Sequence, residues 1–193
     1  MLDKSIPYVH INMIRKSGTP IPNYPLPDGF RFVLYKDGDE ADWARIETSV
    51  DEFDNESEAL MRFQRDFLPY KDELYRRLLF IEDPNGKKVA TANAWWSIVN
   101  SERRSWVHWV SVAPECQGSG LGKAISAQVV KLLTDIDGDT NIWLSTQTWS
   151  YKAINIYKQC GFEPTDEEIL YVNTSKREYR KGLKILKQQG VVF

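Results

Sequence analysis

The 193-residue sequence contains only two cysteines, Cys116 and Cys160, and only two histidines. Two cysteines are too few for a disulfide framework or for a closed structural zinc site. Neither stands in the cysteine, histidine and acid arrangement that a cysteine nucleophile needs, so we interpret both as structural. Their scarcity leads us to expect a reducing, cytoplasmic environment and no bound metal.

Long apolar runs are also missing. No segment approaches the roughly 20 apolar residues that cross a bilayer, and residues 1–7 lack the apolar centre of a signal peptide. The formal net charge is -2, which provides no global positive field to attract nucleic acid or an anionic membrane. The sequence therefore predicts a soluble protein that has neither nucleic acid nor a membrane as its partner.

The residues that are present have an ordinary globular balance, with 42% hydrophobic and 27% charged side chains. Such a balance at this length is typical of one folded domain. We expect residues 1–29 to form an N-terminal extension, with an edge strand at residues 8–14 and a proline-rich linker. Residues 30–175 form the main domain, and residues 176–193 form a basic C-terminal helix or tail.

Hydrophobic periodicity predicts the elements of this domain. Strands are expected at residues 30–35, 78–82, 88–96, 105–113, 141–146 and 169–172. Helices are expected at residues 40–50, 57–67, 120–133 and 150–159. Strands that alternate with helices indicate an α/β or α+β fold.

The most informative segment is residues 107–124, in which a strand runs through a glycine-rich turn directly into a helix. Glycines let the backbone approach a ligand, and the free N–H groups at a helix start bind phosphate. A Walker A loop is excluded, because Gln117 stands where its first glycine belongs and Ala124 where its hydroxyl belongs. The dinucleotide fingerprint is excluded as well, because it requires glycine at Lys123.

What remains is Gln117-x-x-Gly120-x-Gly122, which resembles the acetyl-coenzyme A signature of the GCN5-related N-acetyltransferase (GNAT) family. A second match lies in residues 150–162, where Ala153, Tyr157 and Gly161-Phe162 fit the family pattern. Ser150 replaces the asparagine that is usual there. The resemblance covers about residues 30 to 172, and it implies a central mixed, splayed sheet of about six or seven strands flanked by helices.

The resemblance also implies a binding site for acetyl-coenzyme A. Backbone N–H groups of the glycine-rich turn would hold the pyrophosphate, and the backbone of Val110 and Val112 would pair with the pantetheine. The N–H of Val110 would stabilise the oxyanion. The expected coenzyme-binding residues are Val110, Val112, Gln117, Gly118, Ser119, Gly120, Gly122, Lys123, Ser150 and Ala153.

Two side chains are candidates for acid–base catalysis. By resemblance, Tyr157 would protonate the departing thiolate, although a tyrosine with only a core role fits the same helix. His108 occupies the place of a glutamate that often serves as the general base, and its ordinary pKa near 6.5 suits that task. A histidine satisfied by hydrogen bonds within the sheet, or a water chain fed by another group, is equally compatible with the sequence.

The predicted reaction is direct transfer of acetyl to an amine, either a small molecule or a peptide, in a ternary complex. The alternative is a non-catalytic acyl-coenzyme A-binding or regulatory domain. By resemblance, the first two helices would form the acceptor site, and one or two of the many tryptophans would line it. The acidic residues between those helices suit a cationic acceptor: Asp51, Glu52, Asp54, Glu56 and Glu58. The N-terminal strand and the basic tail are possible homodimer contacts.

Overall fold

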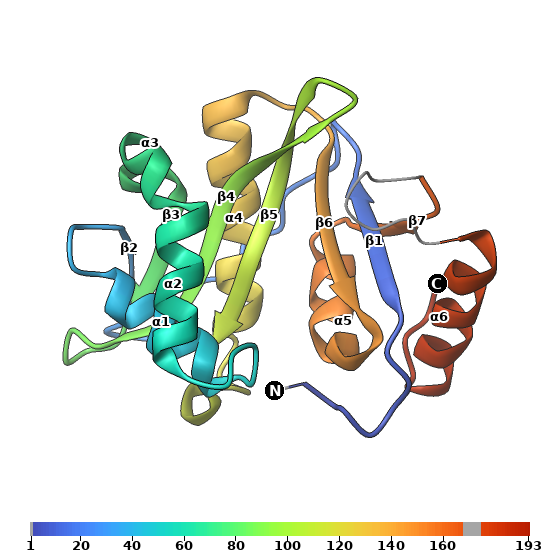
Figure 1. Ribbon diagram of the computed structural model, residues 1–193, viewed down its shortest axis with the longest axis horizontal. Helices are drawn as coiled ribbons and strands as arrows, with labels where there is room; N and C mark the ends of the chain where they lie inside the picture. The colour runs from blue at the N-terminus through green and yellow to red at the C-terminus, as the bar shows by residue number, and fades with distance from the viewer. Residues whose placement is uncertain (1, 168–174) are drawn as a thin grey trace.

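A mixed sheet of seven strands runs through the computed structural model, which describes residues 2–167 and 175–193 (Figure 1). Its spatial order is β2-β3-β4-β5-β6-β1-β7. β5 and β6 are parallel, and all other neighbours are antiparallel. The strands are β1 (His10–Arg15), β2 (Arg31–Leu34), β3 (Leu78–Glu82), β4 (Lys88–Val99), β5 (Glu102–Val112), β6 (Ile142–Gln147) and β7 (Glu163–Thr165).

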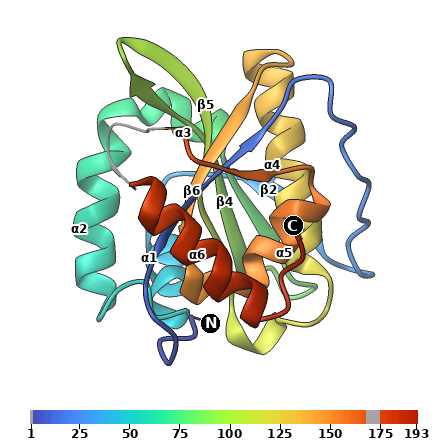
Figure 2. The same cartoon turned by 90° about the vertical axis from the view of Figure 1, so that its right-hand side faces the viewer.

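Helices cover both faces of the sheet. Figure 2 shows α1 and α2 on one side of the strands and α4 and α5 on the other, with α6 beside β1. The helices are α1 (Glu40–Ser49), α2 (Glu56–Asp66), α3 (Lys71–Arg77), α4 (Leu121–Asp137), α5 (Tyr151–Gln159) and α6 (Lys176–Gln188). Within the described residues, no helix has the length and apolar character needed to cross a membrane.

The side chains of β4 alternate between the two faces of the sheet, and each face has its own hydrophobic core. Successive side chains of a strand point to opposite faces. Ala90, Ala92 and Ala94 are therefore packed in the cluster that contains the buried face of α4. Trp95 belongs to the other cluster, which is rich in aromatic side chains from α1 and α2. Thr91 shares the face of Trp95, so the α1–α2 side of the sheet also receives polar side chains.

β1 differs from its sequence-based prediction as an edge strand. It lies between β6 and β7, and Ile11 and Met13 are fully buried. α6 packs closely on it, since a Cβ added to Gly182 would be 2.6 Å from Ile11 Cδ1. The partners of β1 come from the second half of the chain, so its own alternating pattern does not reveal that it is paired on both sides.

Most of the predicted elements are present with small shifts of their ends, but two were not predicted. α3 follows directly on a short 3-10 turn, and β7 has only three residues, one of them Pro164. The predicted strand at residues 169–172 lies outside the described residues. The predicted C-terminal helix begins with a capping box in which Ser175 and Glu178 each accept a hydrogen bond from the other's backbone N–H.

Candidate active site

The sheet opens between its two parallel strands. β5 and β6 pair only from Ser105 opposite Ile142 to Val107 opposite Leu144. Beyond that point the strands separate, as Figure 1 shows, and a cavity of about 770 Å³ lies at the opening. The predicted mixed, splayed sheet is therefore confirmed, and the gap leaves backbone groups of β5 without a neighbouring strand.

A β-bulge in β5 lies at the start of this gap. The register between β4 and β5 shifts where Thr91 pairs with Ser111 and Asn93 pairs with His108. Trp109 within the bulge has a φ of 50°, in the left-handed region that a bulky side chain rarely adopts. The Trp109 ring is held by Trp43 and a stacked Phe53. Bulges and strained backbone of this kind concentrate at functional sites, where they redirect side chains.

A second cavity, of about 450 Å³, lies where the glycine-rich turn enters α4; we call it the smaller cavity and the first one the larger cavity. Gly118 and Gly120 have φ values of 82° and 90°, which explains the need for glycine at both positions. Gly122 serves a different purpose. A Cβ there would lie 3.1 Å from Ile156 Cδ1, so its absence lets α5 approach the start of α4.

All of the predicted coenzyme-binding residues except Ser119 line the smaller cavity. The Ser119 hydroxyl instead donates a hydrogen bond to the Cys116 carbonyl at 2.6 Å. The Gln117 side chain donates to the Val112 carbonyl at 2.9 Å and so ties the turn to the end of β5. Lys152 lines the cavity together with Lys123, although it was not among the predicted coenzyme-binding residues. Its position two residues after Ser150, within the second family motif, could have indicated it.

The two cavities meet, because six residues line both of them. The shared residues are Glu52, Val110, Ser111, Ser150, Ala153 and Tyr157. Tyr157 is 8% exposed at this junction. Burial, followed by the negative charges of Glu52 and Glu47, raises the pKa of the Tyr157 phenol, so it keeps its proton at neutral pH. A ligand that extends from one cavity to the other would pass this hydroxyl group.

His108 lines only the larger cavity. Its ring reaches the cavity, but the Nε2 atom is enclosed and has no hydrogen-bond partner among the described residues. Burial and then the nearby Arg62 charge lower the pKa of His108 to about 4. The imidazole is thus neutral at physiological pH and is a weak proton acceptor.

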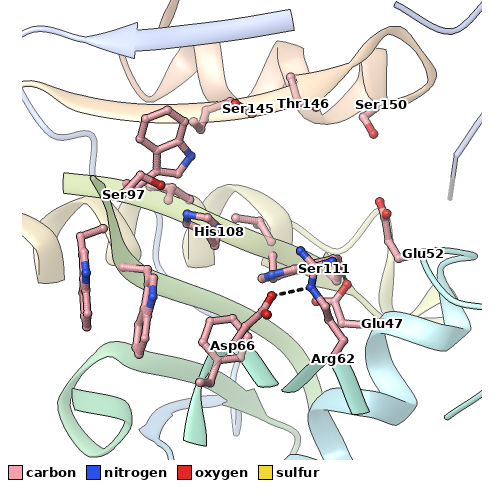
Figure 3. A pocket seen from close by; sticks show the side chains of 18 of the residues that line it. Glu47, Glu52, Arg62, Asp66, Ser97, His108, Ser111, Ser145, Thr146 and Ser150 are labelled. Carbon is pink, nitrogen blue, oxygen red and sulfur yellow. Dashed lines mark hydrogen bonds and ion pairs between the residues drawn. The ribbon is translucent and has the colours of Figure 1, made fainter. Parts of the chain in front are cut away.

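Glu47 on α1 is a functional candidate that the sequence reasoning missed. Its side chain is completely buried at the wall of the larger cavity, where Ser111 Oγ donates a 2.8 Å hydrogen bond to its Oε2 atom (Figure 3). Burial raises the pKa of Glu47 to about 8. The hydrogen bond from Ser111 lowers this pKa, and the nearby Glu52 charge raises it, but both effects are smaller than that of burial. The sequence offered one indication of this buried acid: Glu47 shares the apolar face of its helix with Trp43 and Ile46.

The remaining surface of the larger cavity combines rings with ionic groups. Its aromatic lining residues are Phe67, Tyr70, Trp95, Trp96, Trp106 and Trp109. Arg62 and Asp66 of α2 form an ion pair with a 2.5 Å separation, drawn as the dashed line in Figure 3. The guanidinium of Arg62 also lies 5.5 Å from the Trp109 ring centroid. This lining suits a ligand with a cationic group and a flat or apolar body.

The two cysteines are free thiols. Cys160 is buried, and burial raises its pKa to about 11, so it stays a neutral thiol with no role as a nucleophile at neutral pH. Cys116 is partly buried and its pKa is raised as well. Within residues 2–167 and 175–193, no group of three or more His, Cys, Asp or Glu side chains is placed to hold a metal ion.

The raised pKa of Glu47 leads to a prediction about stability that does not depend on any ligand. Its folded-state pKa of about 8 lies above the ordinary value of 4.5, so the folded protein binds more protons and loses stability as pH rises from 4.5 to 8. We expect Glu47→Gln to remove this loss. The free energy of unfolding of the variant minus that of the original protein should be about 3 kcal/mol larger, that is more stabilising, at pH 8 than at pH 5. Urea unfolding at the two pH values measures this difference, and an equal effect at both would contradict it.

Comparisons with known proteins agree with this geometry. The model of the Acetyltransferase (GNAT) family matches residues 26–162. The mycothiol acetyltransferase of Salinispora tropica is 27% identical over 160 residues, which cover 79% of this chain and 50% of that protein. The chain spans about half the length, or less, of the curated relatives that it matches.

Two solved structures show the same fold at low identity. A GCN5-related N-acetyltransferase from Sphaerobacter thermophilus has a TM-score of 0.64 and 18% identity, covering 82% of this chain and 49% of that one. A fungal GCN5-related glucosamine N-acetyltransferase region has a TM-score of 0.56 and 18% identity, covering 86% and 20%. The family model spans most of the described sheet and both cavities, and it confirms the resemblance carried by Gln117-x-x-Gly120-x-Gly122. This chain belongs to the GNAT family of acetyltransferases.

Proposed function

We propose that this protein transfers the acetyl group of acetyl-coenzyme A to the primary amine of a cationic acceptor, by direct attack in a ternary complex. The observation that carries the proposal is the junction of the two cavities at Tyr157. One cavity has a phosphate-binding turn, and the other has acidic and aromatic side chains. Their meeting point is the one place where a bound thioester and a bound amine would come into contact.

The smaller cavity fits the coenzyme in three respects. The start of α4 offers free N–H groups and the positive end of the helix dipole to the pyrophosphate. Lys123 and Lys152 add two cations at the same cavity. Val110 and Val112 lie beyond the last β5–β6 pair, Val107 opposite Leu144, and their backbone would pair with the pantetheine amides as an added strand.

The thioester supplies an acyl carbon that a neutral amine can attack. The chain's own groups then act on the charges that develop. The N–H of Val110, beside the bulge, stabilises the oxyanion. Tyr157, which stays protonated because of its raised pKa, gives its proton to the departing thiolate. Ser150 and Ala153 line the junction and are small enough to leave room for the acyl group.

The larger cavity supports a primary amine as acceptor. Glu47 and Glu52 supply negative charge or hydrogen-bond acceptors for an ammonium group. The tryptophans of β4 and β5 offer flat faces to the rest of the molecule, whether this is an aromatic body or a sugar ring. The curated relatives are named mycothiol acetyltransferase, a name that supports acetyl transfer.

The release of free coenzyme A thiol from acetyl-coenzyme A tests the proposal. We would supply phenethylamine, glucosamine or spermidine in turn and identify the acetylated amine by mass spectrometry. We expect at least one amine to accelerate thiol release and to gain one acetyl group. Binding of acetyl-coenzyme A without any acetylated product over the panel would support the alternative, a non-catalytic acyl-coenzyme A-binding domain.

A further inference from the structure

Glu47 presents an unusual combination of burial and an unsatisfied oxygen. Its Oε2 atom accepts the Ser111 hydroxyl at 2.8 Å, whereas its Oε1 atom is enclosed and has no hydrogen-bond partner among the described residues. A buried carboxylate oxygen without a partner is costly, and it is rarely retained without a function. Because Glu47 is 0% exposed, a ligand in the larger cavity would reach this carboxyl group through Ser111, which lines the cavity.

Ser111 connects this carboxyl group to the reaction centre. It lines both cavities and is 8% exposed. It stands between Val110 and Val112, the two residues whose backbone faces the gap between β5 and β6. Its hydroxyl proton is directed at Glu47, which leaves the oxygen lone pairs free to accept a proton from the cavity side.

We propose that Glu47, acting through the Ser111 hydroxyl, is the proton acceptor that activates the acceptor amine, and that it takes the role the sequence suggests for His108. This inference rests on the proposed function. The ammonium gives one proton to Ser111 Oγ while Ser111 passes its own proton to Glu47. The amine nitrogen then forms a bond to the acyl carbon, and the carbon–sulfur bond breaks. The thiolate takes the Tyr157 proton, and the second proton lost by the nitrogen restores the phenol.

Burial favours Glu47 over His108 for this step, because it raises the pKa of the carboxyl group and lowers the pKa of the imidazole. The other titratable or charged groups that line the larger cavity are Glu52, Arg62, Arg65, Asp66, Tyr70, His10, His108 and Tyr157. With a pKa of about 8, Glu47 is a better match to an ammonium of pKa near 10 than His108 at about 4.

The pH dependence of kcat/KM tests the assignment. We would use acetyl-coenzyme A and phenethylamine, whose ammonium has a lysine-like pKa, between pH 6 and pH 10. The original protein should gain activity with a slope of one up to about pH 8, where Glu47 loses its proton. Glu47→Gln keeps an oxygen to accept the Ser111 hydrogen bond. It should lower kcat/KM about 100-fold at pH 8 and move the break in the profile from about pH 8 to about pH 10, where the free amine itself forms.

Three further variants make the result specific. Ser111→Ala should also move the break to about pH 10, and it carries the test if Glu47→Gln does not fold. His108→Gln should keep the break at about pH 8. Asp72→Asn removes an exposed acid in the first turn of α3, outside both cavities, and should leave activity unchanged. An unmoved break in folded Glu47→Gln or Ser111→Ala, or a moved break in His108→Gln, would overturn the assignment.

A binding measurement separates failure of this inference from failure of the proposed function. Each variant would be titrated with acetyl-coenzyme A by calorimetry. The role of Glu47 alone would be overturned if the original protein transferred acetyl, the variants still bound acetyl-coenzyme A, and the pH profile of the variants matched that of the original protein. If the original protein neither bound acetyl-coenzyme A nor acetylated any amine of the panel, the proposed function and this inference would both be overturned.

Discussion

Replacing Tyr157 with phenylalanine should lower kcat about 1,000-fold while leaving the affinity for acetyl-coenzyme A almost unchanged. The ring of Tyr157 is buried at the junction of the two cavities, where it lies 6.3 Å from the Phe162 ring centroid. Phenylalanine keeps this packing and removes only the hydroxyl. The departing thiolate then has no positioned proton donor, so the loss falls on turnover rather than on binding.

Tyr151→Phe is the matched control, because Tyr151 lies on the same helix and lines neither cavity. Single-turnover kinetics with acetyl-coenzyme A and an accepted amine would measure the chemical step, and calorimetry would measure coenzyme binding. The control should retain full activity. A Tyr157→Phe protein with the original kcat would remove the tyrosine from the mechanism, whatever the control shows.

Replacing Arg77 with methionine should lower the free energy of unfolding by about 4 kcal/mol. The Arg77 side chain is 1% exposed and bonds three elements: Glu73 of α3 at 2.5 Å, Asp137 of α4 at 2.6 Å and the Ala94 carbonyl of β4 at 3.0 Å. Removing the cation takes the charge partner from Asp137 and a donor from the Ala94 carbonyl, while Glu73 keeps Arg76 and Asp137 keeps only the Ser105 hydroxyl among its printed partners in the described residues. Breaking such a pair from one side costs far more than the pair itself contributes.

Arg76→Met tests whether this cost comes from burial. Arg76 pairs with the same Glu73 at 2.7 Å, but its side chain is 52% exposed. A surface ion pair of this kind contributes at most about 1 kcal/mol. Urea unfolding of both variants, at constant pH and salt, gives the two differences. Equal losses in the two variants would contradict the account of Arg77 as the buried link between α3, α4 and β4.

The strand and helix pattern of this chain could be predicted because the information is local. Neighbouring residues alone indicate that a helix ends before Gly161 and that a strand, a turn and a helix follow one another in residues 107–124. The proposed coenzyme-binding residues also lie within two short segments, around Gly120 and Ala153, and most of them line one cavity. Once these segments resemble a known family, the family pattern supplies their arrangement in space.

The features that could not be predicted depend on contacts between distant parts of the chain. β1 pairs with β6 and β7, which lie more than a hundred residues away, so its central place in the sheet is absent from its own pattern. In the sequence, Glu47 is one of several acidic residues on a predicted helix. The fold brings it next to Ser111 and buries it away from water. The pKa of His108 is lowered by the same burial, which the sequence alone does not show.

The most direct test of the account is thermal unfolding with acetyl-coenzyme A, with ATP and NAD as parallel controls. A ligand at a hundred times its dissociation constant adds about 2.7 kcal/mol, or roughly 5–10 °C for a domain of this size. Ala153→Trp would fill the junction between the cavities and should abolish the rise. We predict a rise with acetyl-coenzyme A alone, lost in Ala153→Trp. No rise with acetyl-coenzyme A, or a larger one with ATP or NAD, would contradict the assignment of the glycine-rich turn.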